Sequence, residues 1–221
     1  MGKTTLSPKQ SHFLELVASE PAIVRKYYFT GGTALAEFHL HHRKSEDIDL
    51  FCETDEVNPV VIEAFLKKTS PKLGVTRIKK NQMLGLVSYK LVYNDGEELK
   101  VDFNYYPFLR ILRGKKYKNL EVDSLQDIAA NKMHTIFMKP RSRDFIDLYF
   151  ILKVAKYDLN GVILDAKAKF DWHIDPIGLS SQFMKVGEVG DLPKMLVPFN
   201  QHEMEEFFLG LAKELKKEIF Q

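Results

Sequence analysis

Residues 29–53 read FTGGTALAEFHLHHRKSEDIDLFCE, and the fold can be predicted outward from this stretch. The residues that precede the glycine pair, 26–30, are mostly aromatic or β-branched, which predicts a short strand ending at the glycines. Residues 33–42 have helical periodicity, whereas residues 47–53 alternate acidic and apolar side chains as a strand with one buried face does. The stretch therefore predicts a strand, a helix and a second strand in succession.

The second of these strands carries two carboxylates on one face. Side chains alternate along a strand, so Asp47 and Asp49 point one way while Ile48 and Leu50 point into the core. Carboxylates about 6.5 Å apart along a strand can converge on a pair of cations, and hard oxygen ligands suit Mg²⁺ or Mn²⁺. Two such ions clamp the attacking and leaving oxygens in phosphoryl transfer. A solvated strand edge is the alternative interpretation.

The glycine pair and a later strand supply the other parts of a phosphoryl-transfer site. Gly31 and Gly32 allow the backbone to approach a ligand closely, and with Thr33 they open a helix whose N-terminal amides can hold a phosphate. In residues 98–106, Asp102 is one of the polar residues that alternate with core-forming ones. We expect Asp102 to bind one metal ion and to orient or deprotonate an incoming hydroxyl. A surface carboxylate on an edge strand is the alternative.

The other segments of the first half complete a sheet with flanking helices. Ser7 with Pro8, and Asn58 with Pro59, each pair an N-cap residue with a proline at the first helical position, which predicts a helix at each place; the second helix should end near residue 69. Strands are expected at residues 75–79, 84–93 and 99–106, with a hairpin turn at residues 94–96.

Helical patterns dominate the second half. Ser124 and Asp127 resemble a capping box that opens a helix to about residue 139, and after Pro140 helical patterns return at residues 141–155 and 203–220. The predicted fold class is α+β, with a mixed β-sheet and flanking helices followed by a mainly helical C-terminal region. We expect the division to separate residues 1–122 from residues 123–221.

Composition excludes several classes of protein. Of 221 residues 45% are hydrophobic, which indicates a globular chain, and 32 Lys and Arg against 30 Asp and Glu argue neither for nor against a nucleic-acid partner. The single cysteine, Cys52, excludes an internal disulfide and a Cys-rich zinc site. No apolar run has the length of a signal peptide core or of a bilayer span, so we expect a cytoplasmic protein that does not enter a membrane.

The three histidines of the opening stretch suggest a metal site at first sight. His39, His41 and His42 lack the spacing of four residues that brings two histidines to one face of a helix in zinc sites. We expect solvated histidines at a helix end, where the C-terminal dipole favours them.

Three blocks of the sequence resemble a known family. They read FTGGTALA at residues 29–36, HRKSEDIDLF at residues 42–51 and DIAANKMHTIFMKPRSRDFIDLYFIL at residues 127–152. In these blocks the chain resembles the AbiEii/AbiGii toxin family of nucleotidyltransferases, a branch of the DNA polymerase β-like nucleotidyltransferase superfamily. The resemblance implies a nucleotidyltransferase-type fold and spans about residues 29–152.

The third block is the most specific of the three. The family has Lys, Arg, Arg, Asp and Asp at the positions of Lys132, Lys139, Arg143, Asp144 and Asp147. Lys139 and Thr135 depart from the usual Arg and Ala. We expect Lys132 and Arg143 to contact the nucleotide phosphates or the acceptor, with Asp144 and Asp147 in support. Asp147 lies in an apolar segment and requires a cation, so an ion pair with Arg143 or Lys132 that serves only the structure is an equal interpretation.

Arg43 and Ser45 match the second block and are expected near the nucleotide. Arg43 would steer phosphates, and positioning of the turn is an equal alternative. The basic residues 110–118 would be a solvated face or, with Tyr117 among them, a track for a nucleic-acid backbone.

Together the residues and the resemblance predict a metal-dependent nucleotidyltransferase. Asp47, Asp49 and Asp102 would hold Mg²⁺ or Mn²⁺, and an NMP would pass from an NTP to an acceptor hydroxyl. The resemblance implies a toxin with a separately encoded antitoxin, and the 3′ end of tRNA as one acceptor. A protein hydroxyl as acceptor, and a nucleotide-binding interaction protein without turnover, are the alternatives.

Overall fold

A computed structural model describes residues 4–188 and 190–219, and the chain in it forms two compact units. We call them the sheet unit and the helical unit. The sheet unit comprises Met1–His39, Lys44–Leu109 and Arg113–Ser124, and the helical unit comprises Leu40–Arg43, Arg110–Leu112 and Leu125–Gln221, each within the described residues. The predicted division after residue 122 stays a proposal about independent folding.

Seven strands of the described residues form one mixed sheet in the order β3-β4-β5-β2-β1-β7-β6. The pairs β2–β5 and β1–β7 are parallel and the others antiparallel, so the predicted α+β class with a mixed sheet is confirmed. The strands are β1 Tyr28–Thr30, β2 Ile48–Cys52, β3 Val75–Met83, β4 Leu86–Tyr93, β5 Glu98–Tyr105, β6 Lys116–Tyr117 and β7 Leu120–Val122.

Capping residues begin the two long helices of the sheet unit, as predicted. Ser7 accepts a hydrogen bond from the Gln10 amide and forms a capping box at the start of α1 (Pro8–Ala18). Asn58 accepts from the Val60 and Val61 amides at the start of α4 (Pro59–Leu73). Two short helical segments, α2 (Pro21–Val24) and α3 (Gly31–Leu35), flank β1, and a π-helix η1 (Ala36–Leu40) continues α3.

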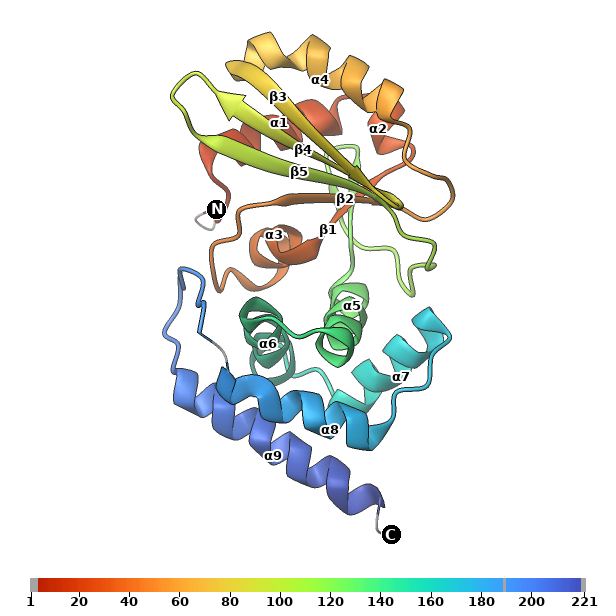
Figure 1. Cartoon of the computed structure of the whole chain (residues 1–221), viewed down its shortest axis with the longest axis vertical. Helices are drawn as coiled ribbons and strands as arrows, with labels where there is room; N and C mark the ends of the chain where they lie inside the picture. Colours follow the sequence, from red (N-terminus) through yellow and green to blue (C-terminus); the bar gives the residue numbers. More distant parts are fainter. Residues whose placement is uncertain (1–3, 189, 220–221) are drawn as a thin grey trace. The chain divides into compact units, whose positions relative to one another are not determined.

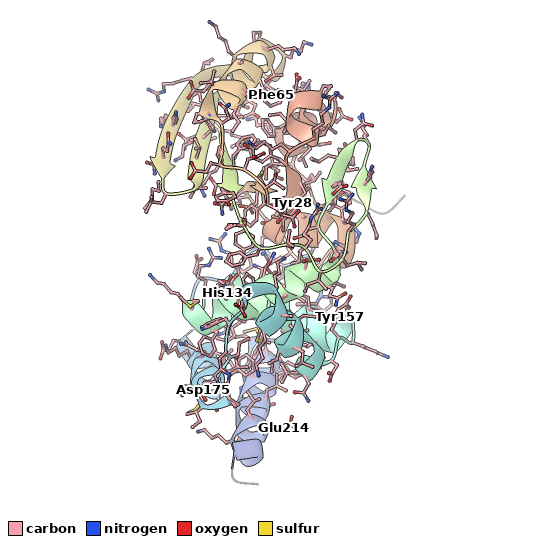
Figure 2. All side chains as sticks on the ribbon, turned by 90° about the vertical axis from the view of Figure 1, so that its right-hand side faces the viewer. Tyr28, Phe65, His134, Tyr157, Asp175 and Glu214 are labelled. Carbon is pink, nitrogen blue, oxygen red and sulfur yellow. The ribbon has the colours of Figure 1, made fainter. Side chains whose placement is uncertain are left out.

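Aromatic contacts build the core on one face of the sheet. Phe103 of β5 contacts Tyr89 of β4 and Tyr27, which directly precedes β1. Phe65 of α4, labelled in Figure 2, contacts Phe13 of α1 edge to face, and Figure 1 shows α4 running beside the edge strand β3. The opposite face of the central strands carries both polar and aromatic side chains.

Several element boundaries differ from the predictions. The strand expected at residues 26–30 begins only at Tyr28, because the amides of Lys26 and Tyr27 both donate to the Ile23 carbonyl at the end of α2. The helix expected to end near residue 69 continues to Leu73, where Gly74 caps it in the left-handed conformation (φ 73°). The basic residues 110–118 contain the short strand β6, which sequence inspection did not predict.

The helical unit contains five α-helices and two short π and 3₁₀ segments among its described residues. They are α5 Leu125–Met138, α6 Ser142–Tyr149, η2 Phe150–Val154, α7 Leu159–Phe170, α8 Pro176–Met184, η3 Lys185–Glu188 and α9 Gln201–Ile219. Phe208 of α9 contacts Phe183 of α8 and Phe145 of α6, and Figure 1 shows α8 and α9 side by side. The helix predicted at residues 203–220 begins two residues earlier, and its last residue lies outside the described part.

None of the helices within residues 4–188 and 190–219 combines the length and the hydropathy that a membrane crossing requires.

A buried ion pair holds α5 and α7 together. Lys169 donates to Asp127 across 2.7 Å, and both side chains are fully buried. The Asp127 carboxylate also accepts from the amides of Ile111 and Leu112. Although burial raises the pKa of Asp127, the bonds from Lys169 and the two amides outweigh it and lower that pKa.

We predict that Lys169→Met lowers the free energy of unfolding by about 3 kcal/mol, because removal of one partner leaves a buried charge unpaired. Urea unfolding followed by circular dichroism measures the change. Lys167→Met, on the same helix and only half-buried, is the matched control and should change stability by less than about 0.5 kcal/mol. Equal stability of the two variants would contradict a stabilising ion pair.

Candidate active site

The pairing of β2 with β5 places two of the predicted carboxylates side by side. Asp49 is the direct partner of Asp102 in the parallel pair. Thr30 lies opposite Asp49 on β1, and Ser88 lies opposite Asp102 on β4. Direct partners in a sheet share one face, so these four side chains form a polar row across the face that the aromatic core leaves open.

Asp47 lies on the same face, two residues before Asp49, and its backbone is held from two sides. Thr33 donates its hydroxyl to the Asp47 carbonyl at 2.5 Å. The Gln10 amide group donates to the carbonyls of Ser45 and Glu46 at 2.9 and 3.0 Å. Gln10 in the first turn of α1 and Thr33 in the first turn of α3 thus hold the backbone just before the acidic strand.

Asp102 lies on an internal strand and is only 8% exposed. Because β5 runs between β4 and β2, the alternative of a surface carboxylate on an edge strand is wrong. Ser88 donates its hydroxyl to one carboxylate oxygen (2.5 Å), and the Lys100 ammonium donates to the other (2.6 Å). Burial lowers the pKa of Lys100, but the hydrogen bond to Asp102 and the charges of Asp102, Asp47 and Asp49 outweigh it and raise that pKa.

Gly31 must be glycine for two separate reasons. Its backbone is in the left-handed region (φ 76°), which side chains with a Cβ rarely adopt. A Cβ at this position would also overlap the Asp49 carboxylate, whose Oδ2 packs directly over the Gly31 Cα. The glycine motif therefore creates the space in which one of the three carboxylates sits.

The donor set fits a hard divalent cation. Asp47, Asp49 and Asp102 provide carboxylate oxygens, the ligands that Mg²⁺ and Mn²⁺ prefer. The Lys100 ammonium lies 2.6 Å from an oxygen of Asp102 and 3.7 Å from one of Asp47, so these two acids already share one cation. No group of three or more His, Cys, Asp or Glu side chains in the described part is gathered closely enough to hold a metal ion as it stands. Metal binding would thus require the carboxylates to close in.

The charged residues of the third sequence block form a buried network in the helical unit. Asp147 accepts two hydrogen bonds from the Arg43 guanidinium (2.6 and 2.8 Å), one from Lys132 (2.7 Å) and one from His42 Nε2 (2.8 Å). Lys132 also donates to Asp144 at 2.7 Å. Burial raises the pKa of Asp147, but the charges of Lys132 and Arg43 outweigh it and hold that pKa well below its usual range. The stabilisation is complete above about pH 4 and is lost as the pH falls below it.

This network explains why a carboxylate is tolerated in an apolar segment, and it supplies the ion pair that one interpretation of Asp147 requires. The pairing cations are Lys132 and Arg43, however, and not Arg143. Both cations are buried, with exposures of 7% and 1%. Their predicted contact with a nucleotide stays a prediction, as does that of Ser45, which is half-buried.

The expectation of three solvated histidines is wrong for His42. Its side chain is fully buried, and burial lowers its pKa, so the neutral ring donates from Nε2 to Asp147. His39 is half-buried and its Nε2 lies 3.0 Å from the Asp123 carbonyl, whereas His41 is exposed. Sequence inspection could not foresee the partner of His42, which lies about a hundred residues further along the chain.

Arg143 is exposed, unlike Lys132, the other basic residue of its block that we expected near the nucleotide. It lines a cavity of about 510 Å³ in the helical unit. The basic and acidic side chains around this cavity are Lys139, Arg141, Arg143, Lys185, Glu188 and Asp191. The surplus of basic groups suits an anionic ligand.

Comparison with known families shows to which family the chain is related. A family model described as the nucleotidyl transferase AbiEii toxin of a Type IV toxin–antitoxin system matches residues 13–218. The chain belongs to the AbiEii family. It is thus a nucleotidyltransferase family enzyme, and the match includes the C-terminal region in which sequence inspection found no resemblance.

Solved structures show the same fold. JHP933 from Helicobacter pylori is similar with a TM-score of 0.57 and 21% identity, covering 96% of this chain and 94% of that one. MenT4, a nucleotidyltransferase toxin from Mycobacterium tuberculosis, has a TM-score of 0.52 and 13% identity, covering 94% of this chain and 81% of that one. A search of curated proteins found no match.

Sequence inspection missed three contributors to the candidate site, namely Gln10, Ser88 and Lys100. Gln10 was visible only as part of a helix start. Ser88 lies opposite Asp102 and Lys100 lies beside Asp47, but this follows only once the registers of β4 with β5 and of β2 with β5 are known. The available signal was the polar residue at every second position of β5, with Ser88 and Lys90 at alternate positions of β4.

We predict that Gly31→Ala destabilises the protein by more than the 1–2 kcal/mol that a left-handed backbone costs a residue with a Cβ, because the new methyl group overlaps Asp49. Gly96→Ala is the matched control: Gly96 also has a positive φ (85°), but a Cβ there would meet nothing within 4 Å. Urea unfolding of both variants isolates the overlap.

The same two glycine variants made in an Asp49→Ala protein test whether the overlap with Asp49 causes the extra cost. Gly31→Ala should then cost no more than Gly96→Ala, because the carboxylate is gone. An undiminished cost in that background would show that Asp49 does not pack on Gly31.

We predict that substitutions of two basic residues in the third block change the stability by very different amounts. Lys132→Met should lower the free energy of unfolding by about 3–5 kcal/mol, because it strips a partner from two buried carboxylates. Arg143→Met should change it by less than about 0.5 kcal/mol, because Arg143 is exposed. Urea unfolding tests both, and a Lys132→Met protein as stable as Arg143→Met would contradict the structural role of Lys132.

Proposed function

We propose that this AbiEii protein transfers an NMP from an NTP to an acceptor hydroxyl and requires Mg²⁺ or Mn²⁺. The observation that carries the proposal is the pairing of Asp49 with Asp102, beside Asp47, around one cation position already held by an ammonium group. Three carboxylates on one face of the sheet repel each other, and a cation among them offsets that repulsion. A protein that only bound a nucleotide would not need this arrangement.

The three carboxylates would have different roles in the transfer reaction. Asp47 and Asp49 would hold the metal ions, which when bound neutralise charge on the reacting phosphate oxygens. Asp102, kept in place by Ser88, would bind a metal ion and accept the proton of the acceptor hydroxyl. The acceptor oxygen would form a bond to the α-phosphorus while the bond to the leaving pyrophosphate breaks.

The nucleotide phosphates would lie against Gly31, Gly32 and Thr33. Gly31 lets the Asp49 carboxylate lie close to the backbone, and the amides at the start of the helical segment would hold the phosphates beside it with their partial positive charge. Of the basic residues in the third block we assign an anion contact to Arg143, which is exposed and lines a cavity within the helical unit. Lys132 and Arg43 would support Asp147 instead.

We propose RNA, with the 3′ end of tRNA as the specific acceptor, in accordance with the family resemblance. Membership of a Type IV toxin–antitoxin family supports a separately encoded antitoxin as partner. A cytoplasmic location, expected from the sequence analysis, remains part of the proposal.

The test incubates the protein with Mg²⁺, each labelled NTP in turn, and either total tRNA or cell extract. We predict label on RNA, and a loss of at least about 100-fold in rate for Asp49→Asn, because a metal ligand is worth several kcal/mol in the transition state. Asp55→Asn, an exposed loop position that follows the same strand, is the control and should retain the full rate.

Label on protein instead of RNA would show that the acceptor is a protein hydroxyl, and the proposed nucleotidyl transfer would still hold. Absence of label with every NTP, together with undiminished toxicity of Asp47→Ala and Asp49→Ala, would contradict catalysis.

A further inference from the structure

Lys100 is placed among the three carboxylates by the register of the sheet. Ile48 pairs with Val101, so the preceding residues, Asp47 and Lys100, lie next to each other on the open face. Lys100 also precedes Asp102 by two positions and therefore shares its face. The ammonium reaches both acids, at 2.6 Å from Asp102 and 3.7 Å from Asp47.

The neighbouring lysines on this face have different partners. Lys90 lies opposite Lys100, and Lys79 lies opposite Lys90, so the three side chains form a row across β3, β4 and β5. Lys79 and Lys90 both pair with Glu98, at 3.0 and 2.9 Å. Lys100 instead gives its charge to the candidate site, on the oxygen of Asp102 that Ser88 does not occupy.

The oxygen that Lys100 holds is one that a metal ion would need. We infer that Lys100 is a built-in cation of the site, which competes with the divalent ion for Asp102 and Asp47 and moves aside when that ion binds. This inference rests on the proposed function and concerns its regulation. The side chain of Lys100 is 42% exposed and has a flexible four-carbon stem, so solvent is open to the displaced ammonium.

Two consequences follow for the metal-free protein. The ammonium offsets the repulsion between Asp47 and Asp102, because it contacts both carboxylates without a metal ion. The same contact lowers the affinity for a divalent cation, because the ion must displace a charge-assisted hydrogen bond of 2.6 Å before it binds. Lys100 is thus a positioning residue that sets the metal affinity.

Calorimetric titration with Mn²⁺ alone, without nucleotide, tests the competition. We predict that Lys100→Met binds Mn²⁺ at least about tenfold more tightly than the wild type, since it removes a competing charge in contact with the ligands. Without metal and in the presence of a chelator, its melting temperature should be lower than that of the wild type. Lys100→Arg, which keeps the charge, should return the Mn²⁺ affinity toward the wild-type value.

Lys90→Met is the matched control, because it removes the same kind of side chain from the next strand in the same row. It should leave the Mn²⁺ affinity unchanged, because Lys90 pairs with Glu98. Circular dichroism confirms that each variant is folded, and Lys100→Gln serves as a second neutral variant.

The outcomes separate this inference from the proposed function. If Asp49→Asn abolishes Mn²⁺ binding but Lys100→Met and Lys100→Gln bind it no more tightly than the wild type, the competition is refuted and the metal site stands. If neither the wild type nor Lys100→Met binds Mn²⁺, both the competition and the metal site are refuted.

Discussion

The parallel pairing of β2 with β5 is the constraint on which the candidate site depends. Two strands separated in sequence by α4, β3 and β4 meet in one register, which sets Asp49 beside Asp102 and Asp47 beside Lys100. A shift of one residue would turn a whole strand over and carry Asp102 into the aromatic core. The core residues that alternate with these acids, Val101 and Phe103 among them, therefore specify the site as much as the acids do.

The parts around this pairing depend on one another. Gly31 gives Asp49 its space, and Ser88 fixes one oxygen of Asp102 while Lys100 holds the other. In the helical unit Lys132 ties Asp144 to Asp147 in a buried network, whereas Arg143 of the same sequence block is exposed. Charged residues in one family motif thus have different physical roles, which burial and pairing reveal and residue type does not.

Features that depend on neighbours in the sequence could be predicted, whereas features that depend on contacts between distant residues could not. Helix starts at Ser7 and Asn58 and the alternation in β2 and β5 follow from neighbours in sequence, so they were predictable. The burial of His42 was not, because its partner Asp147 lies on a helix far along the chain. The role of Lys100 was missed as well: alternation puts it on the same face as Asp102, but its proximity to Asp47 depends on the register of β2 and β5, which alternation alone leaves undetermined.

The central claim is that Asp47, Asp49 and Asp102 form one cation site in which Lys100 stands where a metal ion binds. A crystal structure with Mn²⁺ and a non-hydrolysable NTP, with anomalous scattering to locate the metal, tests it most directly. The account predicts Mn²⁺ bound by all three carboxylates and the Lys100 ammonium withdrawn from Asp102. Manganese bound elsewhere, with Lys100 still on Asp102, would contradict it.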